Sequence, residues 1–226
     1  MLNNSDLKTT PLHSMHKELG GKLVPFAGWH MPIQFKGVIE EHKCVRDGVG
    51  IFDVSHMGEI EITGPDAKKL IQYLVTNDIE SMQNNQALYT LMCLETGGVV
   101  DDLLVHRFSD EHYFLCVNAS NSDKDFQWIL KNAGDFDAVV KNTSQKTAQL
   151  AVQGKQSEVL LQKLCNIPLS EIEYYHFRKG KIHNFECILA RTGYTGEDGF
   201  EVDLDSQHAE SVYKALIEEG KPFNLQ

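Results

Sequence analysis

The sequence predicts an α+β fold whose sheets are antiparallel or mixed and whose helices are amphipathic. The main observation is a pattern that occurs twice: an alternating strand, then a glycine, then an amphipathic helix. It begins at Glu59–Thr63 with Gly64, and again about ninety residues later at Ala148–Gln153 with Gly154. Each copy is followed by a strand pair and a second helix, an order that does not build the parallel sheet of a doubly wound fold.

The elements of each copy follow from the spacing of apolar residues. The first helix of each copy carries them at helical spacing: Leu70, Ile71 and Leu74, and then Leu160, Leu161 and Leu164. Later elements are expected at Val99–Arg107, His112–Val117, Ser122–Ala133, Phe185–Arg191, Phe200–Asp205 and Ser206–Glu219, of which the third and the last are helices. Ser122 and Ser206 are suited to cap these two helices, and Gly134 and Gly220 to close them.

Composition limits the classes of function. The 226 residues are 42% hydrophobic and 23% charged, typical of one or two globular domains. A formal net charge of −11 argues against nucleic-acid partners and anionic membrane surfaces, and no apolar run reaches the length of about 18 residues that predicts a membrane span. The five scattered cysteines lack metal-ligand spacing, and the N-terminus lacks a signal or transit pattern, so a cytoplasmic location with reduced thiols is expected.

The segment Arg191–Glu201 is the first candidate for a binding site. It holds three glycines, one tyrosine and three carboxylates directly after a strand-like run. The carboxylates argue against a phosphate cradle, which uses a lysine and bare N–H donors. Tyr194 could instead stack on a planar group while a carboxylate accepts its N–H bonds. An ordinary glycine-rich hairpin with solvated acids explains the same residues equally well.

A second candidate is the pair Asp101 and Asp102, which interrupts the apolar strand that follows Gly97 and Gly98. Carboxylates are depleted in strands and rarely buried without a partner. Neighbouring side chains of a strand point to opposite faces, so these two cannot act together as acid and base. One is expected to face a cavity, and the spacing leaves open which one.

Five segments in order resemble the T-protein of the glycine cleavage system, a tetrahydrofolate-dependent aminomethyltransferase: Lys8–His13, Phe26–Pro32, Gly50–Met57, Gly97–Leu103 and Arg191–Glu201. The resemblance runs from about Lys8 to the last residue. It implies the duplicated folate-binding fold of that family, with a first subdomain at 1–54 plus 138–226 and a second at 55–137. T-proteins are longer, so the resemblance covers their N-terminal folate-binding portion and not their C-terminal β-rich domain.

The resemblance implies transfer of a methylene unit from an aminomethyl-lipoyl group to tetrahydrofolate, with release of ammonia. Tetrahydrofolate is then the co-substrate, and a lipoylated H-protein is the partner that supplies the lipoyl group. Asp102 matches the catalytic acid of the family, with an electrostatic and orienting role at the reacting nitrogen. No metal, nucleic acid or membrane is expected, because the histidines show no metal-ligand spacing.

The same matching implies the folate-binding residues. Glu201 corresponds to the pterin-binding glutamate, with Glu197 as its rival. The other matched positions are Tyr194, Tyr89, Asn118, Met57 and Tyr174, and Tyr175 is the alternative to Tyr174.

Other members of the fold superfamily give alternative functions. A truncated, inactive folate-binding module and a demethylase-type relative both remain open. Proteins of iron–sulfur cluster maintenance carry a cysteine in a Lys-Gly-Cys-Tyr-type loop, and the stretch Arg191–Tyr194 has none, which disfavours that class.

Overall fold

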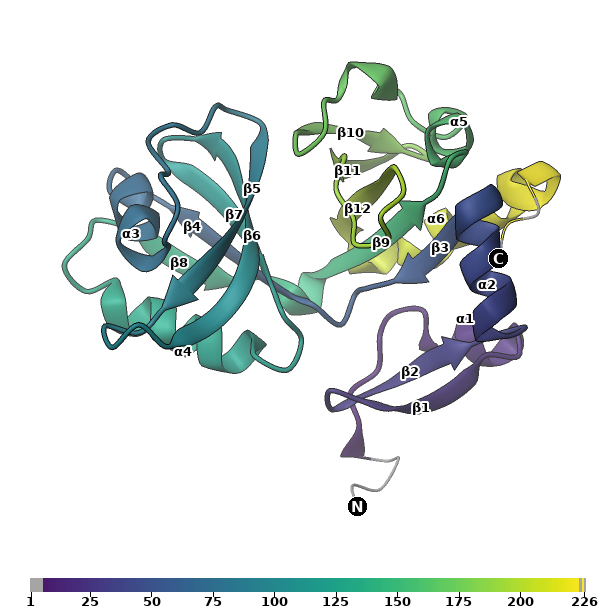
Figure 1. The fold of residues 1–226 in the computed structure, drawn as a ribbon, viewed down its shortest axis with the longest axis horizontal. Coiled ribbons are helices and arrows are strands. Elements are labelled where there is room, and N and C mark those ends of the chain that lie inside the picture. The colour runs from purple at the N-terminus through teal and green to yellow at the C-terminus, as the bar shows by residue number, and fades with distance from the viewer. Residues whose placement is uncertain (1–5, 224, 226) are drawn as a thin grey trace. The chain divides into compact units, whose positions relative to one another are not determined.

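The computed structural model describes residues 6–223 and 225 (Figure 1). The chain forms two compact units. Unit 1 comprises the residues up to His56, Lys146–Tyr174 and the chain from Arg178 onward, and unit 2 comprises Met57–Gln145 and Tyr175–Phe177. The α+β class expected from the sequence is confirmed, because helices pack on antiparallel sheets in both units.

Unit 1 is built on a five-stranded antiparallel sheet in the order β10-β11-β12-β9-β3. Its strands are β3 (Gly50–Asp53), β9 (Thr147–Gln153), β10 (Phe177–Ile182), β11 (Phe185–Ala190) and β12 (Gly199–Asp205). Helices α5 (Ser157–Gln162) and α6 (Ala209–Gly220) supply Leu160, Leu161 and Leu216 to the core beneath β12. The unit also contains α1 (His13–Glu18), α2 (Val38–Asp47) and the hairpin of β1 (Lys22–Phe26) and β2 (Trp29–Gln34).

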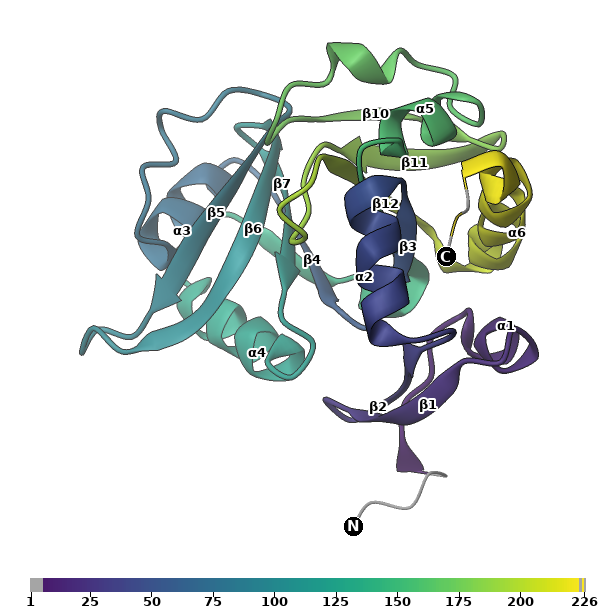
Figure 2. The ribbon, with the colours of Figure 1, turned by 45° about the vertical axis from the view of Figure 1, so that its right-hand side comes forward.

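Unit 2 has a second five-stranded antiparallel sheet in the order β5-β6-β7-β4-β8. Its strands are β4 (Gly58–Thr63), β5 (Gln86–Cys93), β6 (Val99–Ser109), β7 (His112–Val117) and β8 (Val139–Asn142). Helices α3 (Ala67–Leu74) and α4 (Ser122–Asn132) lie on one face of this sheet, as the two views in Figures 1 and 2 show. Four short 3₁₀ turns complete the described elements: Ser144–Lys146, Leu169–Glu171, Ser206–His208 and Lys221–Phe223.

The two units share two local features, a glycine turn and a helix glutamine that binds the loop after the helix. Gly64 and Gly154 have φ angles of +124° and +125°, and a Cβ atom at either would lie 2.6 Å or less from a backbone oxygen. Only glycine fits such a turn without strain. Gln72 of α3 donates to the carbonyl of Asn77 and accepts from the amide of Ile79. Gln162 of α5 does the same, at the same spacing, with Ile167 and Leu169.

The boundary between the units differs from the expected one at its second crossing. The sequence places 138–145 in the first subdomain, whereas β8 pairs with β4 in unit 2 and the crossing falls after Gln145. Strand β8 has only four residues and is mostly exposed, so its sequence pattern does not indicate which sheet it joins. β3 is likewise the edge strand of unit 1 although it directly precedes β4 of unit 2.

The expected capping residues were wrong in both long helices. Gly220 is the last residue of α6 and leads into a 3₁₀ turn, and neither it nor Gly134 takes a positive φ. A 3₁₀ turn can satisfy terminal carbonyls without a left-handed glycine. Asp205, and not Ser206, accepts the capping hydrogen bond, from the amide of Gln207 at 3.0 Å. Asn121 precedes α4 and uses its side chain elsewhere.

Within the residues that the structure describes, no helix combines the length and the apolar character needed to cross a membrane.

Candidate functional site

Strand β6 places Asp101 and Asp102 on opposite faces of the unit 2 sheet. Asp101 is on the face of Leu103 and Val105, which belong to the core beneath α3 and α4, and it is only 4% exposed. Asp102 is half-buried on the other face, where it pairs across the strands with Leu91 of β5. Asp102 is therefore the acid on the sheet face that α3 and α4 leave uncovered.

Two side chains fix the carboxylate of Asp102. The hydroxyl of Tyr89 donates to Oδ2 at 2.8 Å, and Nδ2 of Asn118 lies 3.0 Å from Oδ1. Tyr89 is diagonal to Asp102 across the β5–β6 ladder, and Asn118 follows the end of β7. Three of the residues matched from the sequence thus meet at one place in unit 2.

Asp101 is held even more firmly than Asp102. Its Oδ2 accepts from the backbone amide of Asn118 at 3.0 Å, and its Oδ1 accepts from Nδ2 of Asn118 at 3.0 Å and from Nδ2 of Asn121 at 2.6 Å. Burial by itself raises the pKa of Asp101, but hydrogen bonds from Asp125, Asn118 and Asn121 outweigh it, so the pKa lies below its ordinary value. Neither Asn121 nor Asp125 was expected from the sequence to take part in a site.

Met57 is the first residue of unit 2 and is half-buried. Gly58 of β4 pairs with Val117 of β7 at the end of the ladder between these strands. Met57 precedes Gly58 and Asn118 follows Val117, so each lies one residue past that last pair. This register places Met57 at the same end of the sheet as Asn118.

In unit 1, the glycine-rich segment is the loop between β11 and β12. Gln153, at the end of β9, is buried behind it and donates Nε2 to the carbonyls of Thr192 at 3.1 Å and Phe200 at 3.3 Å. Its Oε1 accepts from the hydroxyl of Thr195 at 3.1 Å. A Cβ atom at Gly193, where φ is +157°, would lie 2.0 Å from that same oxygen. The glycine therefore lets the loop close onto the glutamine side chain.

The three carboxylates of the loop have different partners. Glu197 pairs with Arg46 of α2 at 2.9 Å. Asp198 receives two hydrogen bonds from Arg191, at 2.9 and 2.6 Å. Glu201 lies on β12 and accepts a short hydrogen bond from the hydroxyl of Thr192. Among the described residues, only Glu201 of the three has no basic side chain within ion-pair distance.

Burial makes the charged form of Glu201 less favourable than that of an exposed carboxyl. Burial raises the pKa of Glu201 above its ordinary value, and the Thr192 hydrogen bond opposes that shift only in part. Asp203, two residues further along the same face of β12, is buried as well, and burial raises its pKa too. A ligand that donates hydrogen bonds to Glu201 would offset the cost of its buried charge.

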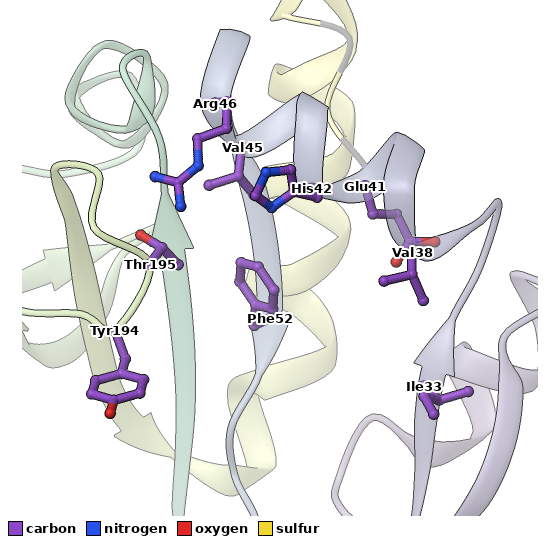
Figure 3. A pocket seen from close by; sticks show the side chains of 9 residues that line it. All are labelled: Ile33, Val38, Glu41, His42, Val45, Arg46, Phe52, Tyr194 and Thr195. Atoms are coloured by element: carbon purple, nitrogen blue, oxygen red, sulfur yellow. The ribbon is translucent and has the colours of Figure 1, made fainter.

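A cavity of about 340 Å³ in unit 1 lies between α2, β3 and the glycine-rich loop (Figure 3). Its lining is mainly apolar, from Ile33, Val38, Val45 and Phe52, with Glu41, His42, Arg46, Tyr194 and Thr195 at its edge. Tyr194 is fully exposed on the loop, so its ring is available to a ligand without any rearrangement of the core.

The two tyrosine alternatives fall in different units. Tyr174 is 69% exposed at the end of a unit 1 segment. Tyr175 is half-buried in unit 2, has a φ of +58°, and accepts at its carbonyl a hydrogen bond from the amide of Ala87. Tyr174 is the more exposed of the two.

Several histidines contact a polar side chain. His13 lies 3.0 Å from His30 and His16 lies 2.8 Å from Asp53, both in unit 1, and in unit 2 His112 lies 2.9 Å from Glu61. Across residues 6–223 and 225, no group of three or more His, Cys, Asp or Glu side chains is arranged to hold a metal ion.

Sequence reasoning missed Gln153, Thr192, Arg46, Asn121 and Asp125 as site residues. Gln153 interrupts an apolar strand just before a repeated glycine, and Asn121 and Asp125 have the one-turn spacing of helix neighbours, so weak local signals existed. Nothing local links Arg46 to Glu197, which lie 151 residues apart in the chain.

A family model described as "GCVT N-terminal domain" matches residues 12–226. The chain is 50% identical over 219 residues to an aminomethyltransferase of Chloroherpeton thalassium, covering 97% of this chain and 60% of that protein. It is 51% identical over 222 residues to an aminomethyltransferase of Desulfitobacterium hafniense, covering 98% and 61%. The chain spans about 60% of the length of these curated relatives.

A solved structure has the same fold. The crystal structure of glycine cleavage system aminomethyltransferase T from Bartonella henselae superposes with a TM-score of 0.89 at 32% sequence identity. The match covers 97% of this chain and 59% of that one.

Proposed function

The chain belongs to the GCVT N-terminal domain family, and from that premise we propose that it is the tetrahydrofolate-binding part of an aminomethyltransferase. The reaction moves the methylene carbon of an S–CH2–NH2 group to N5 and N10 of tetrahydrofolate. The C–N and C–S bonds break, ammonia and a free thiol leave, and the two N–H protons of the folate balance them. The thiol belongs to a lipoyl group that a partner protein carries.

Glu201 carries this proposal. The 2-amino-4-oxo edge of a pterin presents adjacent N–H donors, which one carboxylate can accept in a bidentate manner. Of the three loop carboxylates, Glu197 and Asp198 are bound to arginines, and Glu201 is held by a hydroxyl alone in the described part of the chain. This arrangement supports Glu201, rather than Glu197, as the pterin anchor.

Asp102 is proposed as the catalytic residue. The hydrogen bonds from Tyr89 and Asn118 hold its two oxygens in defined positions, so that the carboxylate can orient a folate N–H and stabilise positive charge that develops nearby. Preorganised groups of this kind lose little free energy to reorientation during the reaction. Asn118 and Tyr89 are then the residues that keep Asp102 in place, with Met57 at the same sheet end.

Tyr194 and Tyr174 are proposed as further contacts to the folate, because both side chains are exposed and an aromatic ring can stack on a planar group. The proposed partner is the lipoylated H-protein of the glycine cleavage system, the system to which the description of the Bartonella relative assigns that protein. A cytoplasmic location is part of the same proposal. Burial raises the pKa of the Cys165 and Cys187 thiols to about 12, which fits cysteines kept reduced.

Calorimetric titration with tetrahydrofolate tests the proposal. The 226-residue chain should bind saturably, and Glu201→Gln should weaken binding by about tenfold or more, because a charge-assisted hydrogen bond contributes about 1.5–3 kcal/mol. Glu197→Gln is the matched control and should change the affinity less than about threefold. Asp102→Asn should retain binding and lose transfer.

The outcomes separate the alternatives. Binding without any transfer to folate would favour a folate-binding module over an enzyme. Equal losses in Glu197→Gln and Glu201→Gln would remove Glu201 from its assigned role. A wild-type chain that binds no folate would overturn the proposal.

A further inference from the structure

Asp125 is a fully buried carboxyl in the first turns of α4. Taken as an ionised carboxylate, Asp125 accepts no hydrogen bond in the described part of the chain, and Nζ of Lys124 lies 3.7 Å from its Oδ1. The Lys124 ammonium is itself engaged by the carbonyl of Val100. Burying an ionised carboxylate in such surroundings is costly, so the group is held neutral.

The neighbour of Asp125 is the carboxylate of Asp101. Two ionised carboxylates can only accept, so a hydrogen bond between Asp125 and Asp101, which contributes to the pKa shifts of both groups, requires one proton between them. Asp101 already accepts from Asn118 and Asn121, so it is the better place for the negative charge. Burial, followed by the hydrogen bond and charge of Asp101, raises the pKa of Asp125 to about 8. The proton therefore resides on the Asp125 carboxyl, which donates a hydrogen bond to the Asp101 carboxylate.

Asn118 connects this pair to the other face of the sheet. Its Nδ2 lies 3.0 Å from Oδ1 of Asp101 and 3.0 Å from Oδ1 of Asp102. It also reaches the carbonyl oxygen of Asp102 at 3.0 Å. Asp101 therefore orients the side-chain amide of Asn118, and this amide in turn orients the carboxylate of Asp102.

We propose that Asp125 is a positioning residue for Asp102, a role that rests on the function proposed above. The protonated carboxyl of Asp125 donates a hydrogen bond to Asp101, which holds the Asn118 amide in the orientation that Asp102 needs. A second negative charge at Asp125 would repel Asp101 and release that amide. The alternative is that Asp125 only stabilises the start of α4 as a negative charge near its N-terminus.

Other charged groups of the unit do not face Asp125. Glu59, Glu61 and Lys141 of β4 and β8 lie on the sheet face opposite α4, because they alternate with the core residues Ile60 and Ile62. On α3, the cations pair elsewhere, with Glu80, Asp110 and Asp66. The titration of Asp125 is therefore governed by Asp101 and Lys124.

The decisive measurement is a pH titration of the Asn118 side-chain NH2 signals by NMR, from pH 6 to pH 9.5, on the whole 226-residue chain. In the wild type, these signals should shift with a midpoint near pH 8, when Asp125 ionises. Asp125→Asn keeps an uncharged donor and should remove that transition. Asp123→Asn, an exposed acid in the same turn, should leave it unchanged. Asn118 signals that do not titrate near pH 8 in the wild type would overturn the proposal.

Turnover supplies the functional readout. Asp125→Ala should lower kcat about tenfold, the effect of losing one hydrogen bond of about 1.4 kcal/mol, with KM for tetrahydrofolate within about twofold. Asp125→Asn should restore most of kcat and abolish its decline above pH 8. Circular dichroism confirms that both variants fold. If the chain binds no tetrahydrofolate, the proposed function fails. The NMR titration of Asn118 still tests whether ionisation of Asp125 changes the environment of the Asn118 amide.

Discussion

The hydroxyl of Tyr89 lies 2.8 Å from Oδ2 of Asp102, across neighbouring strands of unit 2. The tyrosine ring is 49% exposed, so its hydroxyl is not needed to fill the core. A hydrogen bond between two partly exposed groups contributes little to folding. Its main consequence is that the second oxygen of the carboxylate has a fixed direction, beside the oxygen that Asn118 fixes.

Tyr89→Phe should therefore separate positioning from stability. We expect transfer turnover to fall about five- to tenfold, corresponding to roughly 1 kcal/mol, while the free energy of unfolding changes by less than about 1 kcal/mol. Steady-state kinetics and urea unfolding check the two parts. Tyr73→Phe, on an exposed tyrosine of α3, is the control and should alter neither. Unchanged turnover in Tyr89→Phe would show that the hydroxyl is not needed to place Asp102.

Gln153→Ala should loosen the glycine-rich loop of unit 1. The change removes the donor to the carbonyls of Thr192 and Phe200 and the acceptor of Thr195, and it leaves a cavity. We expect a loss of about 2–4 kcal/mol of stability and faster amide hydrogen exchange over 192–198. Because Thr192 carries the hydroxyl that holds Glu201, tetrahydrofolate affinity should fall as well.

Gln162→Ala is the matched control for that experiment. Gln162 is also a side-chain amide that fastens a loop of unit 1, through Ile167 and Leu169. Its removal should speed exchange over 165–169 and leave 192–198 and folate affinity unchanged. Slow exchange at 192–198 in Gln153→Ala would mean that the loop is held by its ion pairs instead.

The elements with a strong hydrophobic period were predictable from the sequence. The strand expected at His112–Val117 has those bounds in the structure, and the helix expected at Ser122–Ala133 ends one residue earlier. Helix ends were less predictable, because Gly220 remains within α6 and Gly134 follows α4 without adopting the left-handed conformation that such a glycine usually signals. Asn121 was not identified as the residue before α4, because its side chain serves Asp101 rather than the helix.

The site was only partly predictable, for a physical reason. The alternation of β6 separates Asp101 from Asp102, but which face is covered depends on where α3 and α4 pack, a property of the whole unit. The partners of the loop acids are equally non-local, as the Arg46–Glu197 pair illustrates. A sequence period carries no information about such contacts.

Acid should destabilise unit 1 through Asp53. This buried carboxylate accepts from Thr10 at 2.6 Å, His16 at 2.8 Å and the amide of Ser55 at 3.0 Å. Burial raises the pKa of Asp53, but these hydrogen bonds outweigh it and hold the pKa below its ordinary value of 3.8. A carboxyl whose folded pKa is the lower one stabilises the fold above the unfolded pKa and loses that contribution as pH falls through the folded pKa.

Asp53→Asn should accordingly cost about 3 kcal/mol at pH 7 and progressively less below about pH 4. Urea unfolding at pH 7, 5 and 3.5 measures the difference from the wild type. Asp47→Asn, at an exposed position of α2, should cost less than about 0.5 kcal/mol at every pH. A deficit for Asp53→Asn that stays constant down to the lowest pH would assign the effect to shape rather than to charge.

The duplication itself can be tested at its two glycine turns. A Cβ atom at Gly154 would lie 2.4 Å from the carbonyl oxygen of Gly48, and one at Gly64 would lie 2.6 Å from that of Asp137. Both residues also have positive φ, which costs an L-residue roughly a further 1–2 kcal/mol. Gly154→Ala and Gly64→Ala should each destabilise their own unit by about 3 kcal/mol or more.

Gly134→Ala is the control, because a Cβ atom there meets nothing within 4 Å and φ is not positive. It should be neutral, or stabilising by about 0.4–1 kcal/mol, since alanine restricts the unfolded chain. Hydrogen exchange resolved by unit distinguishes where each variant acts. An equal loss of stability in each unit, confined to that unit, would show that both glycine turns have the same steric requirement. A variant that keeps its stability would show that the backbone of that turn can move away from the added methyl group.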